Sequence, residues 1–260
     1  MLKVARALVV LWAVAAGAPL GRSQDEKKAP PDPKPRIAMA LPLSVTPGAT
    51  AKVTLRGLNL DQATEVKLAE AVLGATVVVK SKGKAEMPKE TDPAVYGDTK
   101  VELEIKLPEL APEKLLLVAV TAAGQTAPYE LLVLSKDKLV LEKEPNGGFA
   151  TAQPVEAGQV VQGCVSQALD VDVFRIAGRK GEAWVFEVEA QRRGSVLDAM
   201  LLLHNKDGQT LAAVDDTKAS RDPSLRVVLP ADGPYFITVM DAHNSGGATH
   251  VYLLRIRREG

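Results

Sequence analysis

The sequence has little cysteine and few aromatic residues, and it has no excess of acidic over basic residues or of basic over acidic ones. Its 260 residues include one cysteine, and aromatic residues make up 4 %. A single cysteine excludes an internal disulfide bond, and so few rings leave a core of mostly Val, Leu and Ala. Basic and acidic residues number 32 each, so no basic excess indicates a nucleic-acid partner. Cys164 lies in the alternating run VVQGCVSQ, which is typical of a small buried side chain rather than a reactive thiol.

The N-terminus also lacks an apolar run long enough to cross a membrane. The run from Ala7 to Ala18 has about 12 residues, whereas a transmembrane helix needs about 20. Lys3 and Arg6 precede it, and small or polar residues follow. This plan predicts a signal peptide over residues 1–23, and therefore export to the periplasm, the cell surface or the medium, with no transmembrane segment left in the mature chain. Residues 24–36, rich in Pro and Lys, are expected to form a disordered linker.

The rest of the chain reads as short strands separated by turn residues. In TKVELEIKLP, Val101, Leu103 and Ile105 alternate with charged residues, as in a strand that is buried on one face. No long helical periodicity interrupts this pattern. We therefore predict an all-β fold of two β-sandwich domains, over residues 37–135 and 136–260.

The stretch SVTPGATAKVTLRGLNL, near the start of the first predicted domain, resembles the opening of immunoglobulin-like domains of the IPT/TIG type. In those domains a Pro-Gly turn precedes a strand that ends in a similar motif. The resemblance implies an immunoglobulin-like sandwich over residues 37–135. Such domains usually serve as spacers or interaction modules.

The second half carries an ordered series of longer motifs. They are EPN, DVDVFRI, WVFEVEA, DGQTLA, DPSLRVVLPADGPYFITVMD and YLLRI. This series, over about residues 140–258, resembles the bacterial pre-peptidase C-terminal domain family. The resemblance implies a jelly-roll-like β-sandwich on a secreted bacterial protein, often found beside peptidases. With its signal peptide and immunoglobulin-like unit, the chain is similar to planctomycete secreted or surface proteins.

No catalytic motif stands out, so we expect the protein not to be an enzyme. The zinc motif HExxH is missing, and Ser195 lacks the Gly-x-Ser-x-Gly context of a hydrolase nucleophile. Asp215 and Asp216 are adjacent, and adjacent residues on a strand point to opposite faces, so the two converge only if a turn places them. We expect an acidic turn here that also discourages pairing at a sheet edge. Trp184 alternates with apolar residues in WVFEV and is expected in the core rather than on a sugar-binding face. The histidines are far apart in the sequence and are expected at strand ends or in loops: His204, His243 and His250.

Two short acidic segments predict a metal site instead. Glu142 and Glu144 share one side of a strand, and Asp170 and Asp172 repeat this spacing further along the chain. A turn after Pro145 can aim Asn146 back at the glutamates. If the segments lie adjacent, their oxygen atoms converge and repel one another unless a hard cation such as Ca²⁺ binds.

The resemblance points to the same residues. In collagen-binding relatives of the family the matching segments supply calcium ligands, which implies a calcium site at Glu142, Glu144, Asn146, Asp170 and Asp172. Gly147 departs from the family, which usually has Asp or Asn there. The alternative is that both glutamates are solvated, that Pro-Asn-Gly is a plain turn and that Asp172 bonds loop amides.

Taken together, these features predict a non-enzymatic exported protein that binds a partner or acts as a spacer at the bacterial surface or in the periplasm. Its partner would be a protein or a polysaccharide, and not a nucleic acid. One alternative is an accessory module that targets or folds a secreted hydrolase. Another is a truncated part of a larger multidomain surface protein, since the last predicted strand runs almost to Gly260.

Overall fold

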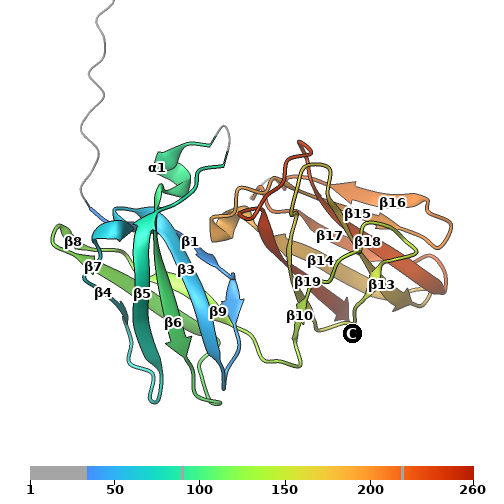
Figure 1. The fold of residues 1–260 in the computed structure, drawn as a ribbon. Helices are drawn as coiled ribbons and strands as arrows, with labels where there is room; N and C mark the ends of the chain where they lie inside the picture. The colour runs from blue at the N-terminus through green and yellow to red at the C-terminus, as the bar shows by residue number, and fades with distance from the viewer. Residues whose placement is uncertain (1–33, 89–90, 218–219) are drawn as a thin grey trace, which may run out of the picture. The chain divides into compact units, whose positions relative to one another are not determined.

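Strands dominate the regular structure of the chain (Figure 1). The structure, a computed structural model, describes residues 34–88, 91–217 and 220–260. The predicted signal peptide and the linker up to residue 33 lie outside the described residues. Strand β1 begins at Arg36, the last residue that the sequence assigned to the linker.

Nine strands between residues 36 and 133 form two sheets. One sheet has the order β1-β3-β6-β5; the other has the order β2-β9-β7-β4, and β8 pairs with β7. Two short helical elements, η1 (Leu60–Gln62) and α1 (Pro93–Tyr96), connect strands. The strands are β1 (Arg36–Leu41), β2 (Ser44–Val45), β3 (Thr50–Leu58), β4 (Glu65–Leu68), β5 (Thr76–Lys84), β6 (Thr99–Lys106), β7 (Lys114–Thr121), β8 (Gly124–Gln125) and β9 (Tyr129–Val133).

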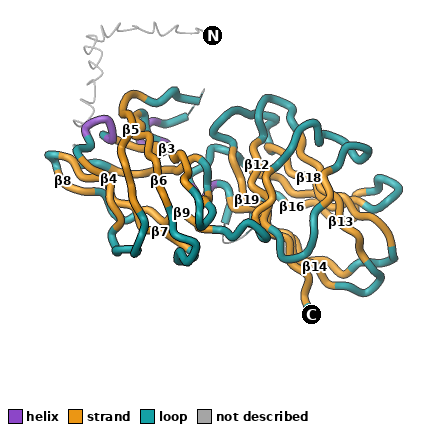
Figure 2. Tube along the Cα trace, turned by 60° about the horizontal axis from the view of Figure 1, so that its bottom comes forward, coloured by secondary structure: helices purple, strands orange, loops and turns teal. Residues whose placement is uncertain are grey.

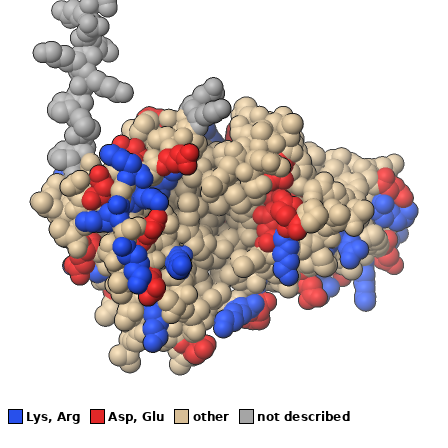
Figure 3. Space-filling view, viewed as in Figure 1, with Lys and Arg blue, Asp and Glu red and all other residues tan. Residues whose placement is uncertain are grey.

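The predicted alternation on β6 is confirmed. Val101, Leu103 and Ile105 are buried in the core between the two sheets, and Glu102 and Glu104 face outward. The outward carboxylates pair with lysines: Glu102 with Lys100, and Glu104 with Lys80 of β5. In Figure 3, basic and acidic side chains are accordingly intermixed over this part of the surface rather than separated by sign.

Ten strands between residues 139 and 259 form two more sheets (Figure 2). Their orders are β10-β12-β19-β14-β17 and β11-β13-β18-β15-β16, and η2 (Gln191–Arg193) follows β14. The strands are β10 (Leu139–Leu141), β11 (Gln153–Pro154), β12 (Val160–Cys164), β13 (Val171–Gly178), β14 (Ala183–Glu189), β15 (Ala199–His204), β16 (Thr210–Val214), β17 (Ser224–Val228), β18 (Gly233–Asp241) and β19 (Val251–Glu259).

The core of these ten strands lies between their two sheets. Alternate residues of β13, β15 and β18 point inward and meet Trp184, Phe186 and Val188 of β14, which are at most 3 % exposed. The expectation that Trp184 belongs to the core is therefore confirmed. The predicted all-β class, built of sandwiches, is confirmed for both strand groups.

A smaller apolar cluster contains residues of both strand groups. Met39, Leu43 and Leu132 pack with Val160 and Leu253. Beside it, the side-chain oxygen of Gln162 accepts hydrogen bonds from the backbone N and the hydroxyl of Ser44, at 2.8 and 3.0 Å. No strand of one group pairs with a strand of the other among the described residues.

Among the helices that the structure describes, none combines the length and the apolar character needed to span a membrane.

Candidate metal site

The acidic segment after β10 runs beside β12 and then reaches β13. Strand β10 pairs in parallel with β12, and the backbone N of Glu142 extends this pairing to the carbonyl of Gln162. Four residues later the carbonyl of Asn146 accepts a hydrogen bond of 3.1 Å from the backbone N of Val173 on β13. Asp172 precedes Val173 and is fully buried. The two acidic segments therefore lie adjacent, although about 30 residues separate them in the sequence.

Three carboxylates converge where the segments meet. Glu142, Glu144 and Asp172 each offer an oxygen, and these atoms all lie within 4.8 Å of one another. Asn146 stands among them: its backbone N donates to Glu144 Oε2 at 2.7 Å, and its Nδ2 donates to Glu142 Oε1 at 3.1 Å. The burial is graded, because Asp172 is inaccessible, Glu142 is half-buried and Glu144 is exposed.

Two buried oxygen atoms at this place have no hydrogen-bond partner. They are Oδ1 of Asn146 and Oδ1 of Asp172, and both residues are 0 % exposed. An unsatisfied buried oxygen costs about 1–3 kcal/mol, so folded proteins rarely keep one without a ligand or water. A cation bound by these two atoms and by the neighbouring carboxylates would remove that cost.

The electrostatics also favour a cation. Burial, together with the adjacent Glu142 carboxylate, raises the pKa of Asp172 to about 9. Burial and the same carboxylates raise the pKa of the nearby Cys164 thiol to about 12, so this half-buried cysteine stays protonated and unreactive at neutral pH. The group binds either a proton or a positive ion, and an oxygen-only donor set suits Ca²⁺.

Asp170, the remaining predicted ligand, makes different contacts. Its Oδ2 accepts hydrogen bonds from the backbone N and the hydroxyl of Ser166, at 2.6 and 2.8 Å, and its Oδ1 accepts from the N of Val171. Leu169 precedes it with a positive φ of 66°. Asp170 thus closes the loop before β13 and is not one of the three converging carboxylates.

Sequence reasoning missed two residues that shape the site. Tyr252 on β19 donates a hydrogen bond of 2.7 Å to Asp172 Oδ2. Gly163 on β12 faces Tyr252 across the sheet, and a Cβ there would overlap the tyrosine ring and crowd Glu142. Glu142 Oε2 accepts a hydrogen bond of 2.6 Å from the backbone N of Cys164, the next residue. The glycine within the strand-like run VVQGCV was the one available signal, because glycine in a strand often marks a close approach.

A second acidic group lies elsewhere in the same ten strands. Oxygens of Asp198, Asp215 and Asp216 are within 4.8 Å of one another, and His243 Nδ1 is 3.3 Å from Asp198. The adjacent aspartates converge because β16 ends at Val214, so that both lie beyond the strand. Because they lie beyond the strand, the rule that adjacent residues point to opposite faces does not separate them. Burial, followed by the charges of Asp215 and Asp216, raises the pKa of Asp198.

The remaining polar residues singled out in the sequence have structural partners. The hydroxyl of Ser195 donates to the carbonyl of Thr249 and accepts from the N of Leu197. Asp241 accepts from the backbone N of His243 and of Ser245 and so orders that loop. The histidines occupy the positions expected of them: His204 ends β15, His243 follows β18 and His250 precedes β19.

Comparison with known proteins gives weak structural similarities. No family model matches the sequence, and no curated protein matches it closely enough to count as a relative. Among solved structures, the pre-peptidase C-terminal domain of collagenase from Bacillus anthracis is 14 % identical, with a TM-score of 0.33 over 45 % of this chain and 100 % of that one. A periplasmic inhibitor of g-type lysozyme from Aeromonas hydrophila is 16 % identical, with a TM-score of 0.34 over 47 % and 98 %.

A third structure, SGBP-B of the Bacteroides ovatus mixed-linkage glucan utilization locus, solved with a heptasaccharide, is 11 % identical. Its TM-score is 0.28 over 86 % of this chain and 74 % of that one. Similarities at this level assign no ligand and no activity to the chain.

Proposed function

We propose that the chain is a non-enzymatic exported protein that binds a protein or polysaccharide at the bacterial surface or in the periplasm. Its first sandwich would be of the immunoglobulin-like type, and its second would be a calcium-stabilised member of the pre-peptidase C-terminal domain family. The observation that supports the proposal is the buried oxygen cluster at Asn146 and Asp172, because it joins residues of the two acidic segments for which the resemblance implies calcium ligands.

In this proposal Glu142, Glu144, Asn146 and Asp172 would hold the ion. Bound Ca²⁺ would supply positive charge to a group that otherwise repels itself. Glu142 is fixed to β12 through the N of Cys164, and Asn146 is fixed to β13 through the N of Val173. The ion would therefore tie the segment after β10 to both sheets of the second sandwich, which is a structural role.

The contacts of Ser195 argue against a role for it as a nucleophile. The Ser195 hydroxyl is engaged by backbone groups on both sides, so it is not a free nucleophile. Asp215 and Asp216 lie on the exposed surface. The two alternatives, an accessory module for a secreted hydrolase and a part of a longer surface protein, stay compatible with this arrangement. A hydrolase gene next to this one would favour the first.

A panel of polysaccharides, cell-wall fractions and matrix proteins tests the binding proposal. The mature chain, residues 24–260, is screened with calcium and with chelator, and the same preparation is assayed for hydrolysis of peptides, esters and glycosides. We expect retention by at least one member of the panel and no turnover. Turnover that disappears in Asp215→Ala or Asp216→Ala would overturn the non-enzymatic proposal.

A further inference from the structure

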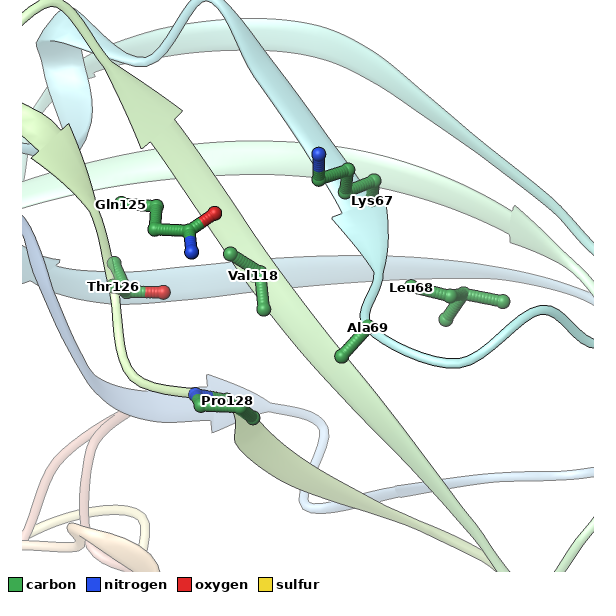
Figure 4. A pocket seen from close by; sticks show the side chains of 7 residues that line it. All are labelled: Lys67, Leu68, Ala69, Val118, Gln125, Thr126 and Pro128. Carbon is green, nitrogen blue, oxygen red and sulfur yellow. The ribbon is translucent and has the colours of Figure 1, made fainter.

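A groove on the first sandwich is not used by any of the features described above. It lies on the outer face of the sheet β2-β9-β7-β4 and has a volume of about 400 Å³ (Figure 4), within the usual range of about 300–1,000 Å³ for ligand sites. Val118 forms its floor, pointing away from the core that Leu117 and Ala119 enter. The lining residues are Lys67, Leu68, Ala69, Val118, Gln125, Thr126 and Pro128.

The strand pairing explains why a hollow forms here. On one side, Lys67 of β4 pairs with Val118 of β7. On the other side, β8 pairs with β7 only at Gly124 and Gln125, and β9 resumes the pairing at Tyr129. Between them, Thr126 keeps a backbone hydrogen bond of 2.9 Å to the carbonyl of Ala119, but its hydroxyl replaces the carbonyl that would accept from the N of Ala119. Gln125, Thr126 and Pro128 line the groove on this side, opposite Lys67.

The two sides of the groove carry different polar groups. In Figure 4, Gln125 and Thr126 lie on one side of Val118, with the Gln125 carboxamide directed toward it, and Lys67 lies on the other side. Thr126 is 4 % exposed, and its hydroxyl oxygen accepts a hydrogen bond of 3.1 Å from the N of Ala119. The hydroxyl proton therefore stays available to a ligand.

The charge of the groove has one sign. Neither Lys67 nor Gln125 has a side-chain hydrogen bond or ion pair to any described residue, and no carboxylate is among the lining residues. Glu65 lies two residues before Lys67 on the same face of β4, but outside the lining. An unpaired ammonium group beside an amide and a hydroxyl favours a ligand that carries one negative charge and several hydroxyl groups.

We propose that this groove binds a hydroxylated carboxylate of the size of one or two sugar-acid units. The carboxylate would pair with Lys67, the hydroxyl groups would bond Gln125 and Thr126, and the C–H face would pack on Val118 and Pro128. This assignment rests on the proposed binding function and gives it one ligand class. An aromatic platform for neutral sugars is not among the lining residues, and one lysine is too little charge for nucleic-acid binding.

Calorimetric titrations of residues 24–260 test the assignment. The probes are free glucuronate, a glucuronate-containing oligosaccharide, a neutral glucose oligosaccharide of equal length, and a short peptide with a free C-terminal carboxylate. We expect the two acidic sugars to bind and the neutral oligosaccharide to bind about tenfold more weakly or not at all, as the loss of a charge-assisted bond predicts. Equal affinities for the two acidic probes support a one-unit site, and tighter binding of the oligosaccharide supports a two-unit site.

Substitutions of lining residues test whether the acidic sugars bind in this groove. Lys67→Gln is expected to weaken acidic-sugar binding about tenfold, and Gln125→Ala is expected to weaken it severalfold. Lys52→Gln is the matched control, because Lys52 is exposed on β3 in the other sheet and likewise has no side-chain partner among the described residues. Both lysine variants should keep the melting temperature of the parent.

Three results would overturn the inference: no binding of either acidic sugar, equal binding by the parent and Lys67→Gln, or a preference for the peptide. If another polysaccharide binds equally well to the parent and to Lys67→Gln, the groove assignment falls while the proposed binding function stands. If neither these probes nor any member of the wider panel binds, the proposed function falls with it.

Discussion

The hydroxyl of Tyr252 donates a 2.7 Å hydrogen bond to Oδ2 of Asp172, and both side chains are 0 % exposed. This bond satisfies one carboxylate oxygen and leaves Oδ1 without a partner. Burial, followed by the Asp172 charge, raises the pKa of Tyr252 well above its ordinary value, so the tyrosine stays a donor at any physiological pH. Asp172 is thereby held in place with one oxygen free for an ion.

Calcium should stabilise the protein. At a calcium concentration of about 100 times Kd, ligand linkage adds about 2.7 kcal/mol to the free energy of unfolding, which for a chain of this size corresponds to a rise in Tm of roughly 5–10 °C. Thermal unfolding of residues 24–260, followed by circular dichroism with millimolar calcium and with chelator, measures the shift.

In that experiment, Asp172→Asn tests whether the calcium-dependent shift in Tm requires the Asp172 carboxylate. The amide keeps an acceptor for Tyr252 but cannot become the carboxylate that would bind the ion, so the variant should fold without calcium and show no calcium shift. Glu156→Gln is the matched control, because Glu156 is exposed and its side chain makes no bond to the described residues. Identical melting curves of the parent with calcium and with chelator would leave Pro145–Gly147 as a plain turn.

Glu189 should be responsible for part of the acid sensitivity of the protein. This carboxylate is 4 % exposed and pairs with Arg193, at 2.7 Å, and with Arg255. Burial alone would raise the pKa of Glu189, but hydrogen bonds from Arg255 and Arg193 outweigh it and lower the pKa. The stabilisation is therefore present above the unfolded-state pKa, about 4.3, and is lost as the pH falls through the lower folded-state pKa.

The substitution Glu189→Gln tests the predicted direction of this pH dependence of stability. Removing one partner of a buried ion pair should lower the free energy of unfolding by about 3 kcal/mol at pH 7, and stability should then fall less steeply below pH 4 than in the parent. Glu187→Gln is the control, since Glu187 pairs with Arg192 and Arg257 at a more exposed position and should cost about 1 kcal/mol or less. Denaturant titrations at several pH values measure the free energy of unfolding. Equal losses of stability in Glu189→Gln and Glu187→Gln at every pH would contradict the role given to Glu189.

Local patterns made the fold predictable. The period-two alternation of β6 and the Trp184 run identified core faces, because a strand exposes and buries alternate residues whatever its partners. The same rule was applied to Glu142 and Glu144, but β10 ends at Leu141, so both glutamates lie beyond the strand, where Asn146 bonds each of them. The rule could not place Asp170, whose carboxylate closes a loop in which Leu169 has positive φ, a conformation that no alternation signals.

Contacts between residues far apart in the sequence could not be predicted either, because alternation along one strand does not say which strands lie together. Tyr252 lies 80 residues from Asp172, and nothing in YLLRI distinguishes a tyrosine that bonds a carboxylate from one that fills the core. The groove over Val118 depends on where β8 stops and β9 resumes, which is a matter of register rather than composition. Predictions from one sequence therefore reach strands and local turns, and they reach sites only where neighbouring residues supply them.

Residues 136–260 should fold without the first sandwich. Their main apolar cluster draws only on residues between Val140 and Ile256, so its burial does not depend on the first 135 residues. The fragment would expose Val160 and Leu253, which pack with Met39 and Leu132 in the whole chain, and its Tm should be lower for that reason. A cooperative thermal transition and a near-ultraviolet circular dichroism signal are expected; a fragment that lacks both and is rapidly proteolysed would show that the sandwiches need each other.

Gly147→Asp should strengthen calcium binding. The family that the second half of the sequence resembles usually has Asp or Asn at this position, where this chain has glycine. Gly147 has no positive φ, and a Cβ there would meet the carbonyl of Val171 at 3.4 Å, an ordinary contact. A side chain can therefore be added without strain, next to Asn146 and the converging carboxylates.

An additional carboxylate raises the charge and the number of oxygen ligands, the two features that tune calcium affinity. The calcium concentration that gives half of the thermal shift should fall severalfold in Gly147→Asp, while the chelator-treated variant should be less stable than the parent because a further carboxylate joins the group. Gly147→Ala, which adds the Cβ without the oxygen, controls for backbone effects and should leave the calcium midpoint unchanged. Equal midpoints in Gly147→Asp and Gly147→Ala would mean that an ion, if bound, lies out of reach of this position.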